Sequence, residues 1–183
     1  MDNMKLLINT SSREKNCYKI LNDIKEDDDY LISLSNKDIK PCRGCGNCKK
    51  QLDEFCIIKD EMHEIYEKMA KAKKIVIATP VYYNFFNGTL KNIIDRTRPQ
   101  FSHTELIKSK EVYLILIGAM SEYENKDVIN MINSYFMGIA GFMEFNFHFA
   151  GYISSGDIEK IDDIEKNNIN YNEILKRIKN SIN

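Results

Sequence analysis

The sequence predicts one α/β domain over residues 1–183, with a doubly wound parallel sheet of five strands and helices on both faces. Short apolar runs alternate repeatedly with longer amphipathic segments, which is typical of strand–helix–strand units. Right-handed crossovers place the helices on both faces of such a sheet. For five strands we expect the order 2-1-3-4-5, in which a ligand binds at the carboxyl ends of the strands, beside the first and the third.

Each expected strand is a short run of apolar residues. KIVIAT and EVYLILIG are continuous apolar runs, as in strands covered on both faces. EFNFHFAGYI alternates, so one of its faces is expected to be less buried. The five expected strands cover residues 4–9, 30–34, 74–79, 111–118 and 144–153.

The expected helices repeat apolar residues with a helical period. They cover residues 17–24, 60–72, 88–97, 126–141 and 171–181. The second opens on acidic residues, which suit the positive end of a helix dipole, and the third stops before Pro99. The segment 157–170 is ambiguous, because Asn167 and Asn168 interrupt any longer helix.

Composition excludes several classes of protein. The chain has 26 basic and 27 acidic side chains, so it lacks the basic surface of a nucleic-acid-binding protein. It has no apolar run of about 18 residues, which a membrane span needs, and its first residues do not resemble a signal peptide. We therefore expect a cytoplasmic protein with neither nucleic-acid nor membrane partners, in which thiols stay reduced unless they are catalytic or bind metal.

The loop NTSSREKN, residues 9–16, follows the first strand and enters a helix. Its hydroxyls and backbone N–H groups can surround an anion at the helix N-terminus. Arg13 adds a donor fork suited to phosphate. Residues of this kind also cap helices, so capping is the alternative interpretation.

Two further loops are expected at the same edge. TPVYYNFFNG, residues 79–88, combines four aromatic side chains with two asparagines, which suits a flat heteroaromatic ligand. The alternative is that Tyr82, Phe85 and Phe86 only pack under the following helix. GAMSEYEN, residues 118–125, begins with residues small or flexible enough for close approach of its backbone to a ligand.

The segment PCRGCGNCKKQLDEFC, residues 41–56, carries four of the five cysteines in the spacing C-x2-C-x2-C-x7-C. A disulfide framework is improbable in the cytosol and with an odd number of cysteines. Zinc sites use separated CxxC pairs, whereas a C-x2-C-x2-C run resembles iron–sulfur proteins. A cluster, a zinc site and unligated or redox thiols all stay open at this point. The candidate ligands are Cys42, Cys45, Cys48 and Cys56.

The cysteine segment follows the second strand, so we expect its thiols at the same edge as the other three loops. Residues 26–29 and 103–110 are expected to be solvated turns at the opposite edge. His103 falls in the second of these, while His63 and His148 are expected to have structural roles. No side chain is therefore expected to act as a catalytic acid or base.

Three pieces of the chain resemble the NAD(P)H-dependent FMN reductase family, which is flavodoxin-like, and in particular its iron–sulfur flavoprotein-like branch. They are TSSR (10–13), KIVIATPVYYNFFNGTLKNIIDR (74–96) and the cysteine segment followed by IIKDEM (57–62). The resemblance covers residues 4–153 and is most specific in PVYYNFFNGTLKNIIDR. The chain departs from the family's pattern at Thr10, where glycine is usual, and at Cys17, where threonine is usual.

The resemblance implies bound FMN and, on the four cysteines, a [4Fe–4S] cluster. It places the phosphate against Ser11, Ser12, Arg13, Asn16 and Cys17. It places the isoalloxazine against Pro80, Val81, Tyr82, Tyr83, Asn84, Phe85, Gly118, Ala119 and Met120.

The activity that the resemblance implies is oxidation of NAD(P)H through FMN, with electrons passed to a small-molecule or protein acceptor. It also implies a homodimer or homotetramer. An electron carrier of the iron–sulfur flavoprotein type and a thiol or metal redox sensor are the alternative functions.

Overall fold

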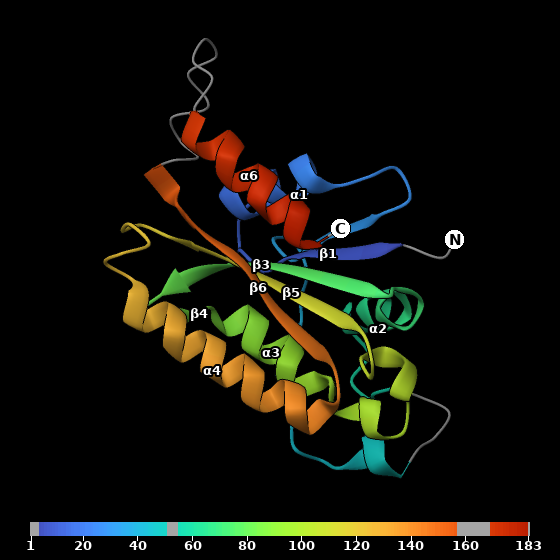
Figure 1. Cartoon of the computed structure of the whole chain (residues 1–183). Coiled ribbons are helices and arrows are strands. Elements are labelled where there is room, and N and C mark those ends of the chain that lie inside the picture. The colour runs from blue at the N-terminus through green and yellow to red at the C-terminus, as the bar shows by residue number, and fades with distance from the viewer. Residues whose placement is uncertain (1–3, 51–54, 157–168, 183) are drawn as a thin grey trace.

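A computed structural model describes residues 4–50, 55–156 and 169–182 (Figure 1). Most of the ambiguous segment 157–170 therefore lies outside the described residues. The strands are β1 (Lys5–Asn9), β2 (Tyr30–Ser33), β3 (Lys74–Tyr82), β4 (Phe85–Phe86), β5 (Glu111–Gly118) and β6 (Asn146–Ser154). The α-helices are α1 (Asn16–Ile24), α2 (Met62–Lys71), α3 (Gly88–Arg96), α4 (Lys126–Met143) and α6 (Ile169–Ile182). Three short 3-10 helices are η1 (Asn47–Lys49), η2 (Arg98–Phe101) and η3 (Thr104–Leu106).

The sheet confirms the predicted topology. Its parallel strands follow the order β2-β1-β3-β5-β6, which is 2-1-3-4-5 when only the parallel strands are numbered. The strand that the sequence did not predict, β4, pairs antiparallel with the end of β3. The five predicted strands are therefore all present, and β4 is an added hairpin.

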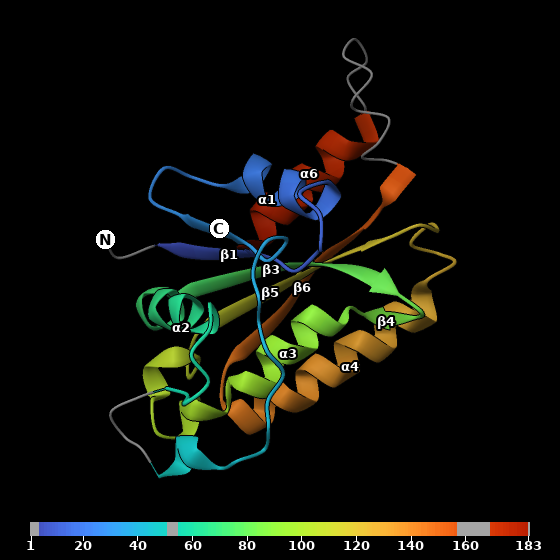
Figure 2. The same ribbon diagram turned by 180° about the vertical axis from the view of Figure 1, so that it is seen from behind.

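Helices cover both faces of the sheet, as predicted (Figures 1 and 2). On one face, α1 and α6 pack over an apolar cluster that includes Leu7, Val76 and Ile115. On the other face, α2, α3 and α4 pack over a larger cluster that includes Leu6 and Leu114. Burial of these apolar side chains is the main term that stabilises the three layers.

Two segments expected to be solvated turns are partly buried instead. Asp29 is 7% exposed, accepts a hydrogen bond from the Lys5 backbone N–H at 2.9 Å and pairs with the Lys5 ammonium. In the segment 103–110, Leu106 and Ile107 lie in the larger core. The other residues of both segments are mostly exposed, as expected. The expectation is wrong for these buried side chains, because short polar sequences do not reveal which of their side chains a neighbouring element covers.

None of the helices within the described ranges combines the length and the apolarity that crossing a bilayer requires.

Candidate functional site

The loop between β1 and α1 is held in shape by the side chain of Asn9, which is completely buried. Its Oδ1 accepts a hydrogen bond from the Ser11 N–H at 3.0 Å, and its Nδ2 donates to the Arg13 carbonyl at 3.3 Å. Nδ2 also donates to Ser33 Oγ of β2 at 2.9 Å. One amide therefore fixes the loop against the neighbouring strand and leaves Ser12 and Arg13 exposed.

The N-terminus of α1 provides an open anion-binding position. Within the described chain, no side chain caps its first turn, and that turn has no acidic residue. Uncapped N–H groups and the helix dipole attract anions such as phosphate. Arg13 is exposed and Asn16 half-buried at this end. The capping alternative is therefore not what the structure shows for this loop.

Cys17 differs from the other residues assigned to this loop. It is 3% exposed and packs within the α1 core cluster. Burial raises the pKa of its thiol to about 12, so the group is a neutral, apolar neighbour of the loop. This burial argues against contact between the Cys17 thiol and a phosphate, and leaves its backbone N–H in the first turn of α1 as the group that can serve an anion.

The segment 80–85 is a β-hairpin rather than an irregular loop. Val81 pairs with Phe86 and Tyr82 with Phe85, joined by Tyr83 and Asn84 at φ values of 47° and 61°. Two consecutive positive φ values are typical of a type I′ turn. The Tyr83 side chain is fully exposed at the tip. An aromatic ring held there by a paired turn is available to cover a flat ligand.

Two aromatic side chains of this segment pack inside the protein, as the alternative interpretation expected, although their ring contacts are with α4 and not with the following helix, α3. Phe86 is 5% exposed and lies 5.6 Å from the Phe136 ring of α4, measured between centroids. Phe85 is half-buried against Phe86 and Tyr135. The hairpin therefore uses its phenylalanines as an anchor and its tyrosines as exposed surface.

Asn87 connects three parts of this edge, and the sequence did not single it out. Its Oδ1 accepts from the Leu90 N–H at 3.2 Å, which caps α3, and from Thr79 Oγ1 at 3.3 Å. Its Nδ2 donates to the Thr10 carbonyl at 2.6 Å. The Asn-Gly pair before an amphipathic run was a recognisable capping signal, but its bond to a residue 77 positions away was not.

The loop after β5 is fixed by Tyr152 of β6, a residue that sequence reasoning also missed. Tyr152 Oη donates to the Met120 carbonyl at 2.7 Å and accepts from Asn125 Nδ2 at 2.6 Å. A Cβ on Gly118 would lie 2.1 Å from this hydroxyl oxygen. The Tyr152 hydroxyl therefore leaves no room for a side chain at position 118, which explains the glycine there. Residues 119–124 of the loop are exposed, beginning with Ala119 and Met120.

These three loops follow β1, β3 and β5, which are neighbours in the sheet. Asn9 is paired with Ala78, and Ala78 with Ile115, so the three strands end side by side. The open N-terminus of α1, the aromatic hairpin and the 118–121 backbone thus meet at the switch point of the sheet. This edge therefore presents uncapped helix N–H groups and exposed aromatic side chains from neighbouring loops.

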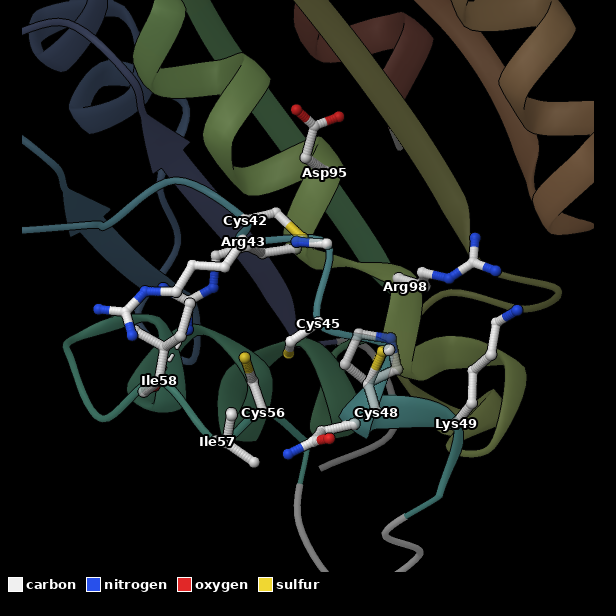
Figure 3. Close-up of a pocket in the computed structure, with 15 residues that line it drawn as sticks. Cys42, Arg43, Cys45, Cys48, Lys49, Cys56, Ile57, Ile58, Asp95 and Arg98 are labelled. Atoms are coloured by element: carbon white, nitrogen blue, oxygen red, sulfur yellow. Dashed lines mark hydrogen bonds between the residues drawn. The ribbon is translucent and has the colours of Figure 1, made fainter.

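The four clustered cysteines line one cavity of about 390 Å³ (Figure 3). All five cysteines of the chain are among the described residues, and each is a free thiol. Cys42 and Cys45 are exposed, while Cys48 and Cys56 are half-buried. Gly44 and Gly46 turn the backbone with φ of 64° and 72°, and the Gly44 N–H donates to Cys42 Sγ at 3.4 Å. The sequence spacing therefore does bring the four thiols to one place.

The charged side chains that line the cavity are mostly basic, and Asp95 is the acidic one among them. The lining from α3 and η2 comprises Asp95, Arg96, Arg98 and Pro99. The cysteine segment itself contributes Arg43 and Lys49. Burial raises the pKa of the Cys48 thiol, and the Arg98 guanidinium opposes this rise. Among the described residues, no three His, Cys, Asp or Glu side chains are gathered closely enough to hold one metal ion.

The position of this cavity corrects one expectation. The thiols were expected beside the other three loops, but the cavity lies at the Arg96 end of α3, whereas the hairpin lies at its Gly88 end. Both ribbon views show the cysteine segment far from β4 (Figures 1 and 2). A nine-residue helix is about 13 Å long, and this length separates the two regions. His103 lies at the cysteine end, with its ring centroid 4.7 Å from that of Phe55.

The order of the parallel strands and the loops at their carboxyl ends define a flavodoxin-like α/β domain. Comparison with known families then identifies it more closely. The model of the NADPH-dependent FMN reductase family matches residues 5–144, and the chain belongs to this family.

Two curated relatives are both called iron–sulfur flavoproteins. The protein from Methanosarcina thermophila is 34% identical over 122 residues, which are 66% of this chain and 62% of the relative. One from Archaeoglobus fulgidus is 39% identical over 102 residues, which are 52% of this chain and 49% of the relative. The chain thus spans about half to three fifths of the length of these relatives.

Solved structures support the fold. A structure of RosB with a bound formyl riboflavin phosphate intermediate has a TM-score of 0.65 at 16% identity, covering 98% of this chain and 76% of that one. An FMN-dependent NADH-azoreductase from Bacillus anthracis in complex with FMN has a TM-score of 0.59 at 14% identity, covering 99% of this chain and 100% of that one. At these identities the likeness shows the fold alone.

Proposed function

We propose that this protein is an FMN-dependent oxidoreductase that oxidises NAD(P)H and passes the electrons to an acceptor. The observation that carries the proposal is the uncapped N-terminus of α1, with Arg13 exposed beside it, in a chain of the FMN reductase family. FMN, when bound, supplies the electron-transfer chemistry. The protein supplies the binding and the orientation of the cofactor.

The residues divide between the two ends of the cofactor. Ser11, Ser12, Arg13 and Asn16, with the N–H groups of the first α1 turn, would hold the phosphate. The hairpin 80–85 and the exposed backbone of Ala119 and Met120 would contact the isoalloxazine. Tyr83 is the side chain best placed to cover the ring, because it is fully exposed at the tip of a paired turn.

Titration of the apoprotein with FMN tests the phosphate position. Arg13→Ala should weaken FMN binding by about 1.5–3 kcal/mol, the range for hydrogen bonds to charged groups. Lys25→Ala is the matched control, because it removes one positive charge just beyond the other end of α1. An Arg13 variant that binds FMN as tightly as the control removes Arg13 from the site.

We further propose that Cys42, Cys45, Cys48 and Cys56 hold a [4Fe–4S] cluster. The shared cavity, its mostly basic charged lining and the names of the curated relatives support this. Protein prepared anaerobically with iron should contain iron and acid-labile sulfide in equal amounts, about four of each per chain. Cys45→Ala should abolish the cluster and leave FMN bound. Stoichiometric zinc, or iron-free protein that still oxidises NAD(P)H, would refute the cluster.

The second candidate function is an electron carrier without turnover of NAD(P)H. The exposure of Cys42 and Cys45 at the surface favours it, because a cluster held there is accessible to a protein partner. Steady-state oxidation of NAD(P)H with free flavin or a quinone as acceptor distinguishes the two functions. A protein that NAD(P)H does not reduce, and that a protein donor does reduce, is a carrier.

The outer face of α4 supports a homodimer or homotetramer. It carries no charge between Asp127 and Glu144, and it exposes Met131, Met137 and Phe142 to between 47% and 67%. Large exposed apolar surfaces of this kind mark interfaces, and a second copy of α4 presents the same uncharged face. Met137→Glu should lower the association state in sedimentation velocity. An unchanged sedimentation coefficient would exclude this face. The cytoplasmic location stays a prediction from the sequence.

A further inference from the structure

The two ends of the cysteine segment lie next to one side chain, Arg96. The segment comprises residues 41–56, of which 51–54 lie outside the described residues. Arg96 Nη1 donates to the Lys40 carbonyl at 3.2 Å, just before the segment begins. Arg96 Nη2 donates to the Ile58 carbonyl at 3.2 Å, just after it ends. One guanidinium at the end of α3 therefore joins the two ends of the segment.

Asp60 completes the junction. One of its oxygens pairs with Arg96 Nη1 and accepts from the Lys40 N–H at 2.9 Å, and the other accepts from the Met62 N–H at 3.2 Å. The side chains of Arg96 and Asp60 are only 1% and 2% exposed. Burial alone would raise the pKa of Asp60, but the bonds from Arg96 and from the Lys40 N–H hold it below its ordinary value.

The pair does more than fill space in the core. A buried ion pair stabilises a fold little more than apolar side chains of the same volume, because desolvation offsets the attraction. What apolar side chains cannot supply is the fixed fork of an arginine, which holds two carbonyl groups at a set separation. Both carbonyls here belong to the ends of the cysteine segment, and Arg96 also lines the cavity.

We propose that Arg96, oriented by Asp60, is the positioning residue of the cysteine segment, and that it fixes the two ends so that the thiols face one cavity before any cofactor binds. The part of this proposal that concerns cluster assembly rests on the proposed iron–sulfur site. The part that concerns the segment's order holds for the metal-free protein as well. Arg96 touches none of the reacting groups and acts through the backbone at Lys40 and Ile58.

The test uses the double variant Arg96→Met/Asp60→Leu, which removes both buried charges together, because removing one would leave the other unpaired. Lys91→Met is the control, because it removes a cation of the same helix whose side chain is 45% exposed. FMN affinity reports on the fold, because the FMN loops lie at the other end of α3. If the double variant does not fold, Arg96→Lys replaces it in both measurements. Lysine keeps a positive charge beside Asp60 but lacks the forked guanidinium that binds both carbonyl groups.

Two measurements decide the proposal. In metal-free protein, the backbone amides of residues 42–48 should exchange hydrogen about tenfold faster in the double variant, in line with the loss of hydrogen bonds to a charged group. Under anaerobic conditions with limiting iron and sulfide, its iron uptake should be about tenfold slower than that of the wild type and of Lys91→Met.

Wild-type exchange rates at residues 42–48 in a variant that binds FMN normally would overturn the proposal. Faster exchange combined with wild-type iron uptake would overturn the claim about cluster assembly. The thiols would then take up iron without the two ends of the segment being fixed. If the wild-type protein takes up no iron, the proposed cluster is refuted, and hydrogen exchange alone decides the role of Arg96.

Discussion

Asn87→Ala should lower the free energy of unfolding by about 1.5–5 kcal/mol. The variant loses the cap of α3 at the Leu90 N–H, which is worth about 0.5–2 kcal/mol. It also leaves the buried Thr10 carbonyl without its 2.6 Å partner, which costs about 1–3 kcal/mol. The two contributions are separate because they use different atoms of the amide. FMN affinity should fall as well, because Thr10 begins the phosphate loop.

Urea denaturation of the apoprotein measures this loss as a lower midpoint at an unchanged m-value. Asn87→Asp keeps the cap acceptor but places a buried carboxylate oxygen against the Thr10 carbonyl, so its loss should be at least as large as the second contribution. Asn92→Ala on the same helix removes a single half-buried bond to the Ile39 carbonyl and should cost about 1 kcal/mol or less. If Asn87→Ala is no less stable than Asn92→Ala, the reasoning about this junction is wrong.

Three further results are expected. Gly118→Ala should destabilise the protein by about 1–3 kcal/mol in urea, because its Cβ would meet the Tyr152 hydroxyl at 2.1 Å; wild-type stability would contradict the fit. Tyr83→Ala should change stability by less than about 0.5 kcal/mol, since the side chain is fully exposed, and should alter FMN affinity or fluorescence; a wild-type flavin titration would exclude the hairpin tip from the site. Because the pKa of Asp60 is lowered by folding, its contribution is present above its ordinary pKa and lost as the pH falls through the folded value. Stability should therefore fall as the pH drops below the ordinary Asp pKa of about 4, and Asp60→Asn should show a shallower fall; equal slopes would contradict this assignment.

The sheet was predictable because its signal is local. The runs at 74–79 and 111–118 are continuously apolar, as strands covered on both faces must be, and both became central strands. The hairpin was not predictable in the same way. The two-residue strand Phe85–Phe86 is too short to show alternation, and its turn depends on positive φ at Tyr83, which a tyrosine seldom adopts.

The sequence predicted the loops of the candidate site but not the side chains that fix these loops in place. Asn9, Asn87 and Tyr152 each act on partners in another element, and a single sequence carries no sign of such tertiary pairs. The loops themselves were recognisable because each directly follows an apolar run.

The cysteine cavity was placed at the wrong end of the sheet for a geometric reason. Residues 34–41 lead away from β2. The Lys40 N–H donates to Asp60, just before α2, and Asn92 of α3 donates to the Ile39 carbonyl. Eight extended residues reach about 25 Å or more, enough to run the length of the sheet. The rule that a loop lies at the edge where its strand ends holds for short loops, and this one is long.

Helix α3 is fastened at both ends, by Asn87 to the phosphate loop and by Arg96 to the cysteine segment. Any displacement of this helix that accompanies loading of one end is therefore felt at the other. Thermodynamic linkage makes such an effect symmetric, so an occupied cavity that tightens FMN tenfold requires FMN to tighten occupancy of the cavity tenfold. Retention of wild-type FMN affinity by Cys45→Ala, as expected above, would instead show that α3 stays fixed and that the two regions fill independently.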